Sequence, residues 1–164
     1  MTERLWAPWR MEYIQGGADT DGCIFCDKAA STDDDANLIV RRGERAYVLM
    51  NLFPYSNGHL MVAPYRHVAA PGDLEEAERA ELWALLDTAL GVLGEVMAPH
   101  GFNAGINIGR VAGAGVEDHL HLHVVPRWNG DTNFMPVLAD VKVMPEHLTR
   151  TAAKLRDAWA DRRA

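Results

Sequence analysis

Three histidines alternate with aliphatic residues in the segment HLHLHVVP, residues 119–126. Successive side chains of a strand point to opposite faces, so His119, His121 and His123 would share one face of an extended segment. In a helix the same imidazoles would scatter around the axis, so the alternation favours a strand. Neighbouring histidines would then lie roughly 6.5 to 7 Å apart. At that spacing one imidazole can attack a phosphorus atom while the next contacts an oxygen of the same phosphate.

The chemistry of such a strand depends on the state of its imidazoles. A neutral imidazole is both a nucleophile and a good leaving group near pH 7, so it can divide one difficult displacement into two easier steps. Its other ring nitrogen must then donate a hydrogen bond, for which a backbone carbonyl is the expected acceptor. Two alternatives are open: the three histidines could all be ligands of a zinc hydrolase, or the strand could simply be rich in histidine.

The two cysteines, Cys23 and Cys26, form a single CxxC motif. The N-terminus, MTERLWAPWRMEYI, lacks the uninterrupted apolar stretch of a secretory signal, so we expect a cytoplasmic protein. In that compartment metal binding or redox chemistry is a more common use of a cysteine pair than a structural disulfide. The pair follows a polar arm rather than a predicted strand, which favours metal over redox chemistry. A tetrahedral zinc site would need two further ligands.

Short strands joined by turns, with helices set apart, surround these residues and indicate an antiparallel α+β domain. The link PYSNG at residues 54–58 contains strong turn formers. Asp73 is a plausible N-cap for a long helix, because apolar residues recur at helical spacing from there to about residue 97. A second helix is expected over about residues 145–160. The predicted strands are LIVR (38–41), RAYVLM (45–50), HLMVAP (59–64), FNAGINI (102–108) and the histidine segment.

Length and composition restrict the possible function classes. The 164 residues suit one domain with a single sizeable core. No apolar run approaches the ~20 residues that span a bilayer, so we expect no membrane partner. The formal net charge of -7 and the lack of a block of lysine or arginine argue against nucleic-acid binding. A pocket could nevertheless hold a small nucleotide with histidines and backbone amides.

The histidine segment resembles the pattern His-φ-His-φ-His-φ-φ of the nucleotide-binding histidine-triad (HIT) superfamily. Pro126-Arg127, the upstream NGHLMVAP and the glycine-rich turn GRVAGAG before the triad also resemble that family. The similarity covers roughly residues 23–128. The flanking segments LWAPWRMEYI and PRWNGDTNFMPV are similar to a bacterial branch that includes diadenosine tetraphosphate phosphorylases.

This resemblance implies a fold and a domain division. A HIT-like domain has an antiparallel five-stranded sheet with a long central helix and a C-terminal helix. Residues 1–22 would then be an N-terminal arm, and residues 23–128 the nucleotide-binding catalytic domain. Residues 129–164 would form a C-terminal loop and helix packed on the same domain. We also expect a homodimer or homotetramer that assembles through the sheet and the central helix.

The resemblance also implies roles for the triad. His121 would attack the α-phosphorus and form a covalent nucleotidyl-histidine, and His123 would contact the phosphate and donate a proton toward the leaving oxygen. Some relatives hold a structural zinc ion with the CxxC motif, a histidine after the NGH strand and the first triad histidine. Here those ligands are Cys23, Cys26, His67 and His119. No organic cofactor is expected.

Further residues match family positions near the nucleotide. Asn51 would contact ribose hydroxyls, His59 would lie behind the triad, and Arg127 with Trp128 would flank the nucleotide. Each has a plain structural alternative, such as a turn, core or packing role. Asn107 would face the phosphate together with backbone amides of Gly113, Ala114 and Gly115. This set is expected to bind the substrate.

The glycine-rich turn departs from the family pattern. Many hydrolytic members have Ala-Gly-Gln-Ser or Ala-Gly-Gln-Thr there, whereas this chain has Ala112-Gly113-Ala114-Gly115 and one extra residue before His119. Loss of the amide and hydroxyl leaves room for a second anion, which favours inorganic phosphate over water as the acceptor. The expected substrate is a dinucleoside polyphosphate such as diadenosine tetraphosphate. Hydrolysis, phosphoramidate cleavage and nucleotide-binding regulation with little turnover are the alternatives.

Overall fold

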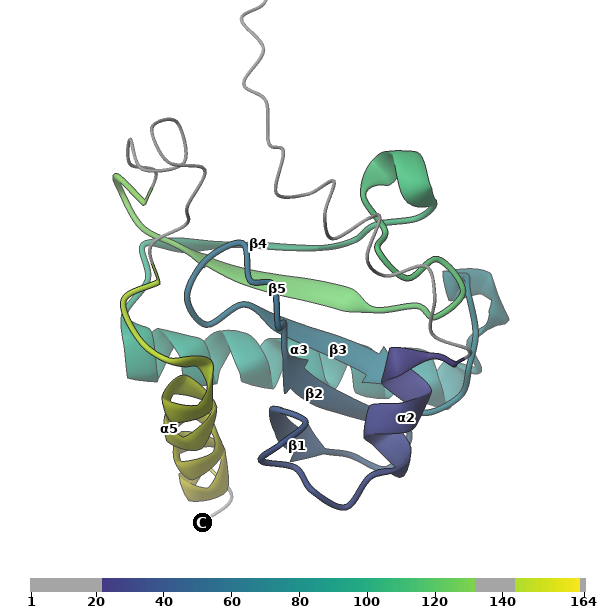
Figure 1. Cartoon of the computed structure of the whole chain (residues 1–164), viewed down its shortest axis with the longest axis horizontal. Coiled ribbons are helices and arrows are strands. Elements are labelled where there is room, and N and C mark those ends of the chain that lie inside the picture. The colour runs from purple at the N-terminus through teal and green to yellow at the C-terminus, as the bar shows by residue number, and fades with distance from the viewer. Residues whose placement is uncertain (1–21, 132–143, 163–164) are drawn as a thin grey trace, which may run out of the picture.

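Five strands form one antiparallel sheet in the order β1-β2-β3-β5-β4 (Figure 1). The computed structural model describes residues 22–131 and 144–162. The helical elements of this part are α2 (Ile24–Ala30), η1 (Pro71–Asp73), α3 (Glu76–Met97), η2 (Arg110–Ala112) and α5 (Leu148–Asp161). The strands are β1 (Ile39–Arg42), β2 (Ala46–Met50), β3 (Leu60–Pro64), β4 (Gly101–Ile106) and β5 (Leu122–Arg127). The predicted α+β fold, with its five-stranded sheet, long helix and C-terminal helix, is confirmed.

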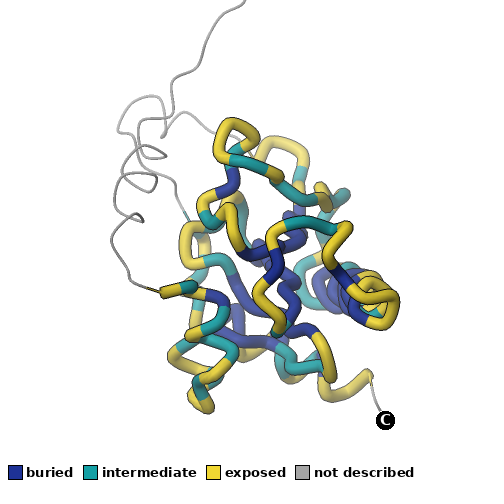
Figure 2. Tube along the Cα trace, turned by 90° about the vertical axis from the view of Figure 1, so that its right-hand side faces the viewer, coloured by how far each residue is buried: buried dark blue, intermediate teal, exposed yellow. Residues whose placement is uncertain are grey.

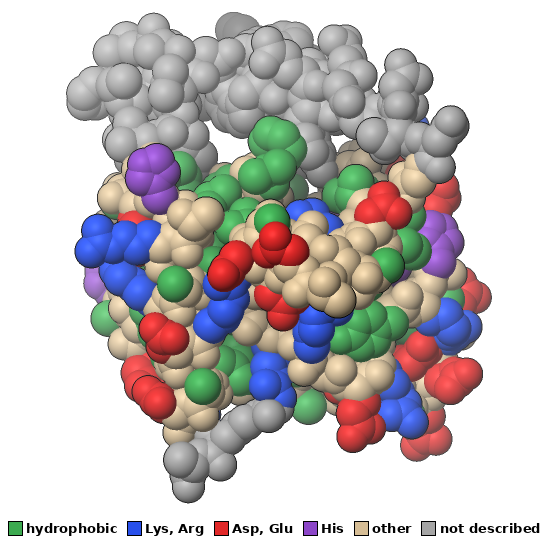
Figure 3. Space-filling view, turned by 60° about the horizontal axis from the view of Figure 1, so that its bottom comes forward, with side chains coloured by type: hydrophobic (Ala, Val, Ile, Leu, Met, Phe, Trp, Pro, Cys, Tyr) green, Lys and Arg blue, Asp and Glu red, His purple; other side chains and the backbone are tan. Residues whose placement is uncertain are grey.

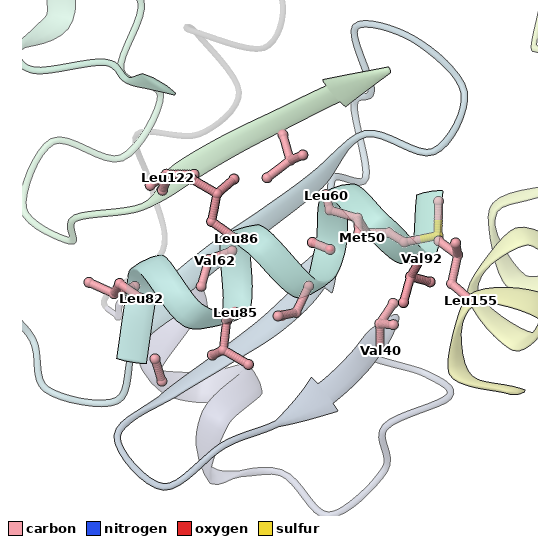
Figure 4. Packing of buried hydrophobic residues seen from close by; sticks show 14 of the residues in the cluster. Val40, Met50, Leu60, Val62, Leu82, Leu85, Leu86, Val92, Leu122 and Leu155 are labelled. Atoms are coloured by element: carbon pink, nitrogen blue, oxygen red, sulfur yellow. The ribbon is translucent and has the colours of Figure 1, made fainter. Parts of the chain in front are cut away.

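The two faces of the sheet pack against different helices. One face carries Met50, Leu60 and Val62, which contact the buried side of α3 and the end of α5 (Figure 4). The other face carries a second apolar cluster centred on Phe25 of α2 and Tyr47 of β2. Figure 2 shows the buried segments gathered in the middle of the molecule and the exposed ones in its loops. The side chains of both faces therefore come from strands that are buried on two sides.

Register places the triad on the α2 face. Leu49 of β2 lies opposite Met61 of β3, and Met61 lies opposite His123 of β5. Residues directly opposite each other in antiparallel strands share a face. His123 is therefore on the side of the Phe25 cluster, away from α3. The long helix supports the sheet from behind and leaves the histidine face open to α2.

The structure corrects two predicted element boundaries. Asp73 does not cap the long helix, because it ends the turn η1, and α3 begins at Glu76 with Glu75 as its N-cap. Glu75 and Glu78 form a capping box there, and the carboxylate of Glu78 also binds Arg66. The predicted strand 119–126 begins only at Leu122, so His119 and His121 precede the regular ladder.

Helix α2 was missed in the sequence because its seven residues are too few to show a helical period. It begins directly after Cys23, so the CxxC motif does open a helix, contrary to the expectation from the polar arm. The predicted arm itself lies outside the described residues, apart from residue 22. The division at residues 22 and 128 stays a prediction.

The surface seen in Figure 3 carries basic and acidic side chains intermixed. The described residues include ion pairs such as Arg42 with Asp34 and Lys154 with Glu146. No helix of the described chain is both long and apolar enough to cross a membrane. The expectations of a cytoplasmic location and of no nucleic-acid partner stay predictions.

Candidate active site and metal centre

Four predicted metal ligands meet at one end of the histidine face. The ligand atoms of Cys23, Cys26, His67 and His119 all lie within 4.8 Å of one another. The Cys23 sulfur is 3.2 Å from Nδ1 of His119, and the Cys26 sulfur is 3.4 Å from Nδ1 of His67. Residues 41 and 93 positions distant from Cys26 are thus brought together. This is the geometry that two thiolates and two imidazoles need around one ion.

Local hydrogen bonds prepare these atoms for a metal. Nε2 of His119 donates to the carbonyl of Pro64 at 2.9 Å, so Nδ1 keeps its lone pair and faces the cysteines. Burial lowers the pKa of His119, which favours the neutral form that binds metals. Burial and the nearby Cys23 raise the pKa of the Cys26 thiol. A bound cation would oppose that effect, because it stabilises thiolates. The donor set fits a tetrahedral zinc ion.

His121 lies next to this cluster in a single defined orientation. Its Nδ1 is 2.8 Å from the carbonyl oxygen of His119. A carbonyl can only accept, so Nδ1 must carry the hydrogen, and Nε2 keeps its lone pair. This confirms the predicted hydrogen bond to a backbone carbonyl. Burial lowers the pKa of His121 more than the bond to His119 raises it. The side chain is therefore a neutral, buried imidazole whose lone pair is at Nε2.

His123 and His59 form a hydrogen-bonded pair beside His121. The backbone N–H of Tyr55 donates to Nδ1 of His59 at 3.0 Å, so Nε2 of His59 carries the hydrogen. That nitrogen lies 2.9 Å from Nδ1 of His123 and donates to it. By elimination, Nε2 of His123 carries a hydrogen in the neutral pair. His123 therefore has a hydrogen-bond donor at Nε2, the ring nitrogen that lies beside Asn107.

The two predicted asparagines both contact this pair. Oδ1 of Asn51 accepts the N–H of Phe53, which turns its amide nitrogen toward Nδ1 of His59 at 3.4 Å. Nδ2 of Asn107 is placed 3.4 Å from Nε2 of His123. Because Nε2 of His123 carries a hydrogen, it needs an acceptor from Asn107. The oxygen and nitrogen of an amide are assigned from their hydrogen-bond partners, so we assign the side-chain oxygen of Asn107 to the position that faces His123. Asn51, His59 and Asn107 are thus brought to the triad.

The glycine-rich turn differs from the expected phosphate cradle. The N–H of Gly113 donates to the carbonyl of Arg110, and the N–H of Ala114 donates to the carbonyl of Gly109. These two amides are already used within the turn around η2, which corrects the expectation that they are free for phosphate. Gly115 is exposed, and its N–H has no partner within the described residues. Within the described residues, the Gly115 amide is therefore the one of the predicted three that is not used inside the turn.

Arg127 and Trp128 lie away from the triad. Arg127 follows His123 by four residues, which is about 13 Å along a strand. Its guanidinium binds Asp131 and the side-chain oxygen of Asn103. Trp128 lines a cavity of about 480 Å³ together with Met97 of α3 and residues near the start of α5. Arg127 shares the strand face of His123 but lies too far along β5 to contact it, and Trp128 lines a different cavity.

Two site residues were not identified in the sequence. Phe25 lies between the two cysteines in the sequence, and its ring contacts both His119 and His121. Tyr55 supplies the N–H that orients His59, and its ring lies against His59 and His123. The CxxC spacing could have indicated that Phe25 lies beside the predicted metal ligands. Nothing in the residue types indicates the backbone role of Tyr55.

The comparison with protein families matches the description "HIT domain" to residues 32–130. The chain belongs to the HIT family. This HIT protein is 42% identical over 165 residues to a Mycobacterium tuberculosis protein named AP-4-A phosphorylase, covering 96% of this chain and 85% of the relative. It is also 36% identical over 84 residues to a bis(5'-adenosyl)-triphosphatase of Dictyostelium discoideum, covering 51% of this chain and 56% of the relative.

A solved structure supports both the fold and the metal cluster. A zinc-bound histidine-triad family protein from Mycobacterium smegmatis superposes on this HIT protein with a TM-score of 0.69 and 25% identity. The match covers 87% of this chain and 96% of that protein. Together with the cluster of Cys23, Cys26, His67 and His119, it suggests zinc.

Proposed function

We propose that this HIT protein cleaves dinucleoside polyphosphates, such as diadenosine tetraphosphate, through a nucleotidyl intermediate on His121. The observation that carries the proposal is the hydrogen bond from Nδ1 of His121 to the His119 carbonyl, which leaves Nε2 as a buried nucleophile. The similarity to a protein named AP-4-A phosphorylase supports the substrate class.

In the first step, the Nε2 lone pair of His121 forms a bond to the α-phosphorus, and the bond from that phosphorus to the bridging oxygen breaks. The N–H at Nε2 of His123 donates a hydrogen bond to the departing oxygen and stabilises its negative charge, while His123 keeps its proton and stays neutral. His59 donates to Nδ1 of His123 and keeps its ring in place. The products are ATP and an adenylyl group on His121 when the substrate is diadenosine tetraphosphate.

In the second step, an acceptor oxygen attacks the phosphorus, and the bond to Nε2 of His121 breaks. We propose inorganic phosphate as the favoured acceptor, which yields ADP and returns His121 to its neutral form. Water would need a general base, whereas phosphate at neutral pH already carries nucleophilic oxygens and requires only donors. Asn107 and the N–H of Gly115 are the candidate donors. These two groups offer fewer hydrogen bonds to phosphate than the Asn107 side chain and three turn amides expected from the sequence would.

The choice of acceptor is testable with labelled phosphate. We expect phosphate to accelerate cleavage of diadenosine tetraphosphate and its label to appear in ADP. Asn107→Ala should raise the apparent KM for phosphate more than the KM for the dinucleotide, because the amide would contact the acceptor. Product analysis by chromatography with radioactive phosphate measures both quantities. Release of AMP without label in ADP, at a rate independent of phosphate, would identify a hydrolase.

Zinc is proposed as a structural ion held by the four-residue cluster. The ion would supply ligand bonds that join α2, the loop after β3 and the segment before β5, and no open coordination position for a substrate is implied. His119 would bind it through Nδ1 while its own carbonyl holds Nδ1 of His121. This arrangement separates the first histidine of the triad from the chemistry of the second.

We also propose that the protein assembles as a homodimer, through the free edge of β4. This strand pairs only with β5 among the described residues, and its sequence GFNAGI contains no charged residue or proline. Isolated edge strands usually carry such groups to prevent pairing with other chains. Pairing with β4 of a second copy would satisfy the edge and extend the sheet across a two-fold axis. A homotetramer, the alternative expected from the sequence, would need a second interface in addition to this edge.

The edge can be tested by the molecular mass in solution. Ala104→Lys places a charge on an exposed position of β4 and should convert the dimer to a monomer, because like charges would meet across the axis. Light scattering after size-exclusion chromatography measures the mass. Ala80→Lys, on the exposed side of α3, is the control for an added surface charge. A variant that stays dimeric would exclude this edge as the interface.

A further inference from the structure

We propose that Phe25 is a positioning residue through which the CxxC segment holds the imidazole of His121. The inference rests on the proposed function, in which Nε2 of His121 is the nucleophile. It assigns to a residue between two metal ligands a role in catalysis that is separate from metal binding. The supporting contacts come from α2 on one side and from the start of β5 on the other.

The ring of His121 is enclosed on three sides. The Phe25 ring centroid lies 4.7 Å away with an interplanar angle of 30°, so one face of the imidazole rests on the phenyl ring. The ring of His123 lies 4.8 Å away at 72°. Nδ1 is held by the carbonyl of His119. Phe25 and His121 are 1% and 5% exposed, so water does not fill the space between them. Turning the imidazole over would require Phe25 to move.

Phe25 itself is held in place by the two cysteines of the CxxC motif and by the sheet. Cys23 and Cys26 flank it in sequence, and their sulfurs belong to the metal cluster. Its carbonyl oxygen accepts the hydroxyl of Tyr47 at 2.7 Å, and the Tyr47 ring is fully buried and stacked on Tyr65. The phenyl ring therefore cannot shift without disturbing the cysteine pair or β2. The position of the metal ligands is thus transmitted to the face of His121.

A purely structural role would make Phe25 equivalent to other members of its apolar cluster. Ile39 is the useful comparison, because it is fully buried in the same cluster but lies on β1. β1 is three strand spacings from β5 in the sheet, which is about 14 Å. Truncating Ile39 therefore creates a cavity in the same cluster without a direct contact to His121. The two residues differ in what they touch, not in how deeply they are buried.

The experiment compares Phe25→Leu and Phe25→Ala with the control Ile39→Ala in the zinc-loaded protein. We expect kcat for diadenosine tetraphosphate to fall about 10-fold in Phe25→Leu and about 100-fold in Phe25→Ala, with the KM little changed, because displacement of a reacting group by about 1 Å has effects of this size. Zinc should stay at about one per chain. Nitrogen-15 spectra of the histidines should show His121 shifting from one tautomer to a mixture. Ile39→Ala should leave kcat and the tautomer unchanged.

Each contrary result overturns a specific part of the proposal. Unchanged kcat and an unchanged His121 tautomer in both Phe25 variants would show that the ring does not position the imidazole. An increase in KM alone would show that Phe25 is only a wall of the substrate pocket. Loss of zinc together with activity in both variants would show that it acts only by retaining the metal. If His121→Ala stayed active, the proposed function would fail, while a changed tautomer would still establish the contact as an orienting one.

Discussion

Replacing His121 with alanine is expected to reduce turnover more than about 100-fold, which corresponds to about 2.7 kcal/mol of activation free energy. The variant loses the only atom proposed to form the bond to phosphorus, whereas the N–H of His123 can still donate a hydrogen bond to the leaving group. Nucleotide affinity and zinc content should stay nearly unchanged, because neither the metal cluster nor the asparagines include this side chain. Steady-state kinetics and equilibrium binding of a non-cleavable analogue measure the two effects separately.

A covalent intermediate gives a second measurement of the same role. Radioactive substrate mixed with the unchanged protein and quenched in alkali should leave label on the chain, since phosphorus–nitrogen bonds are labile in acid. His121→Ala should carry none. The exposed residue His100 provides the control, because its recorded side-chain contact is the backbone N–H of Asn129. His100→Ala should label and turn over normally. Retention of more than about a hundredth of the activity by His121→Ala would assign the nucleophile to another group.

The alternation of histidine and aliphatic residues was sufficient to predict which side chains share a face. That inference depends only on the two-residue period of extended backbone. It holds although the regular ladder begins at Leu122, because Phe25 contacts both His119 and His121, and the ring of His121 contacts that of His123. The antiparallel α+β fold followed in the same way from short strands and nearby turns. Features that follow from a repeating pattern in the sequence, such as the shared face of the histidines, were therefore predictable.

Features that depend on individual backbone hydrogen bonds were not predictable. The sequence of the turn at residues 109–115 shows that glycines are present, but not that the amides of Gly113 and Ala114 are used internally. Asp73 has the right residue type for an N-cap, yet Glu75 caps α3 because Glu78 completes a capping box with it. The role of Tyr55 lies in its N–H, which every residue except proline possesses. Such choices are made by tertiary geometry between competing local partners.

The metal ligands are an intermediate case. The CxxC motif predicts a metal or redox site by itself, but nothing in its spacing selects His67 and His119 from seven histidines. The resemblance to a family supplied those two, and the structure places their Nδ1 atoms beside the two sulfurs. The geometry therefore supports zinc independently of the family resemblance from which the ligands were predicted.

Removing one cysteine should show most directly how much a zinc ion contributes to the stability of the fold. Cys26→Ser is expected to lower the zinc content well below one per chain and the melting temperature by roughly 10 °C, or about 3 kcal/mol of unfolding free energy. The thiolate is a far better zinc ligand than a hydroxyl, and its loss releases α2 from the loop after β3. Elemental analysis and calorimetry measure the two quantities. Asp27→Asn, at the next position of the same helix, should change neither.

The same variant also separates a structural ion from a catalytic one. If zinc only holds α2 and His119 in place, the folded fraction of Cys26→Ser at low temperature should bind nucleotide, with turnover reduced through the position of His121. A catalytic zinc would instead leave the melting temperature nearly unchanged and remove all turnover. Purified unchanged protein that holds no metal, or that melts at the same temperature after chelation, would exclude the structural ion. The four side chains would then be a hydrogen-bonded cluster of two thiols and two imidazoles.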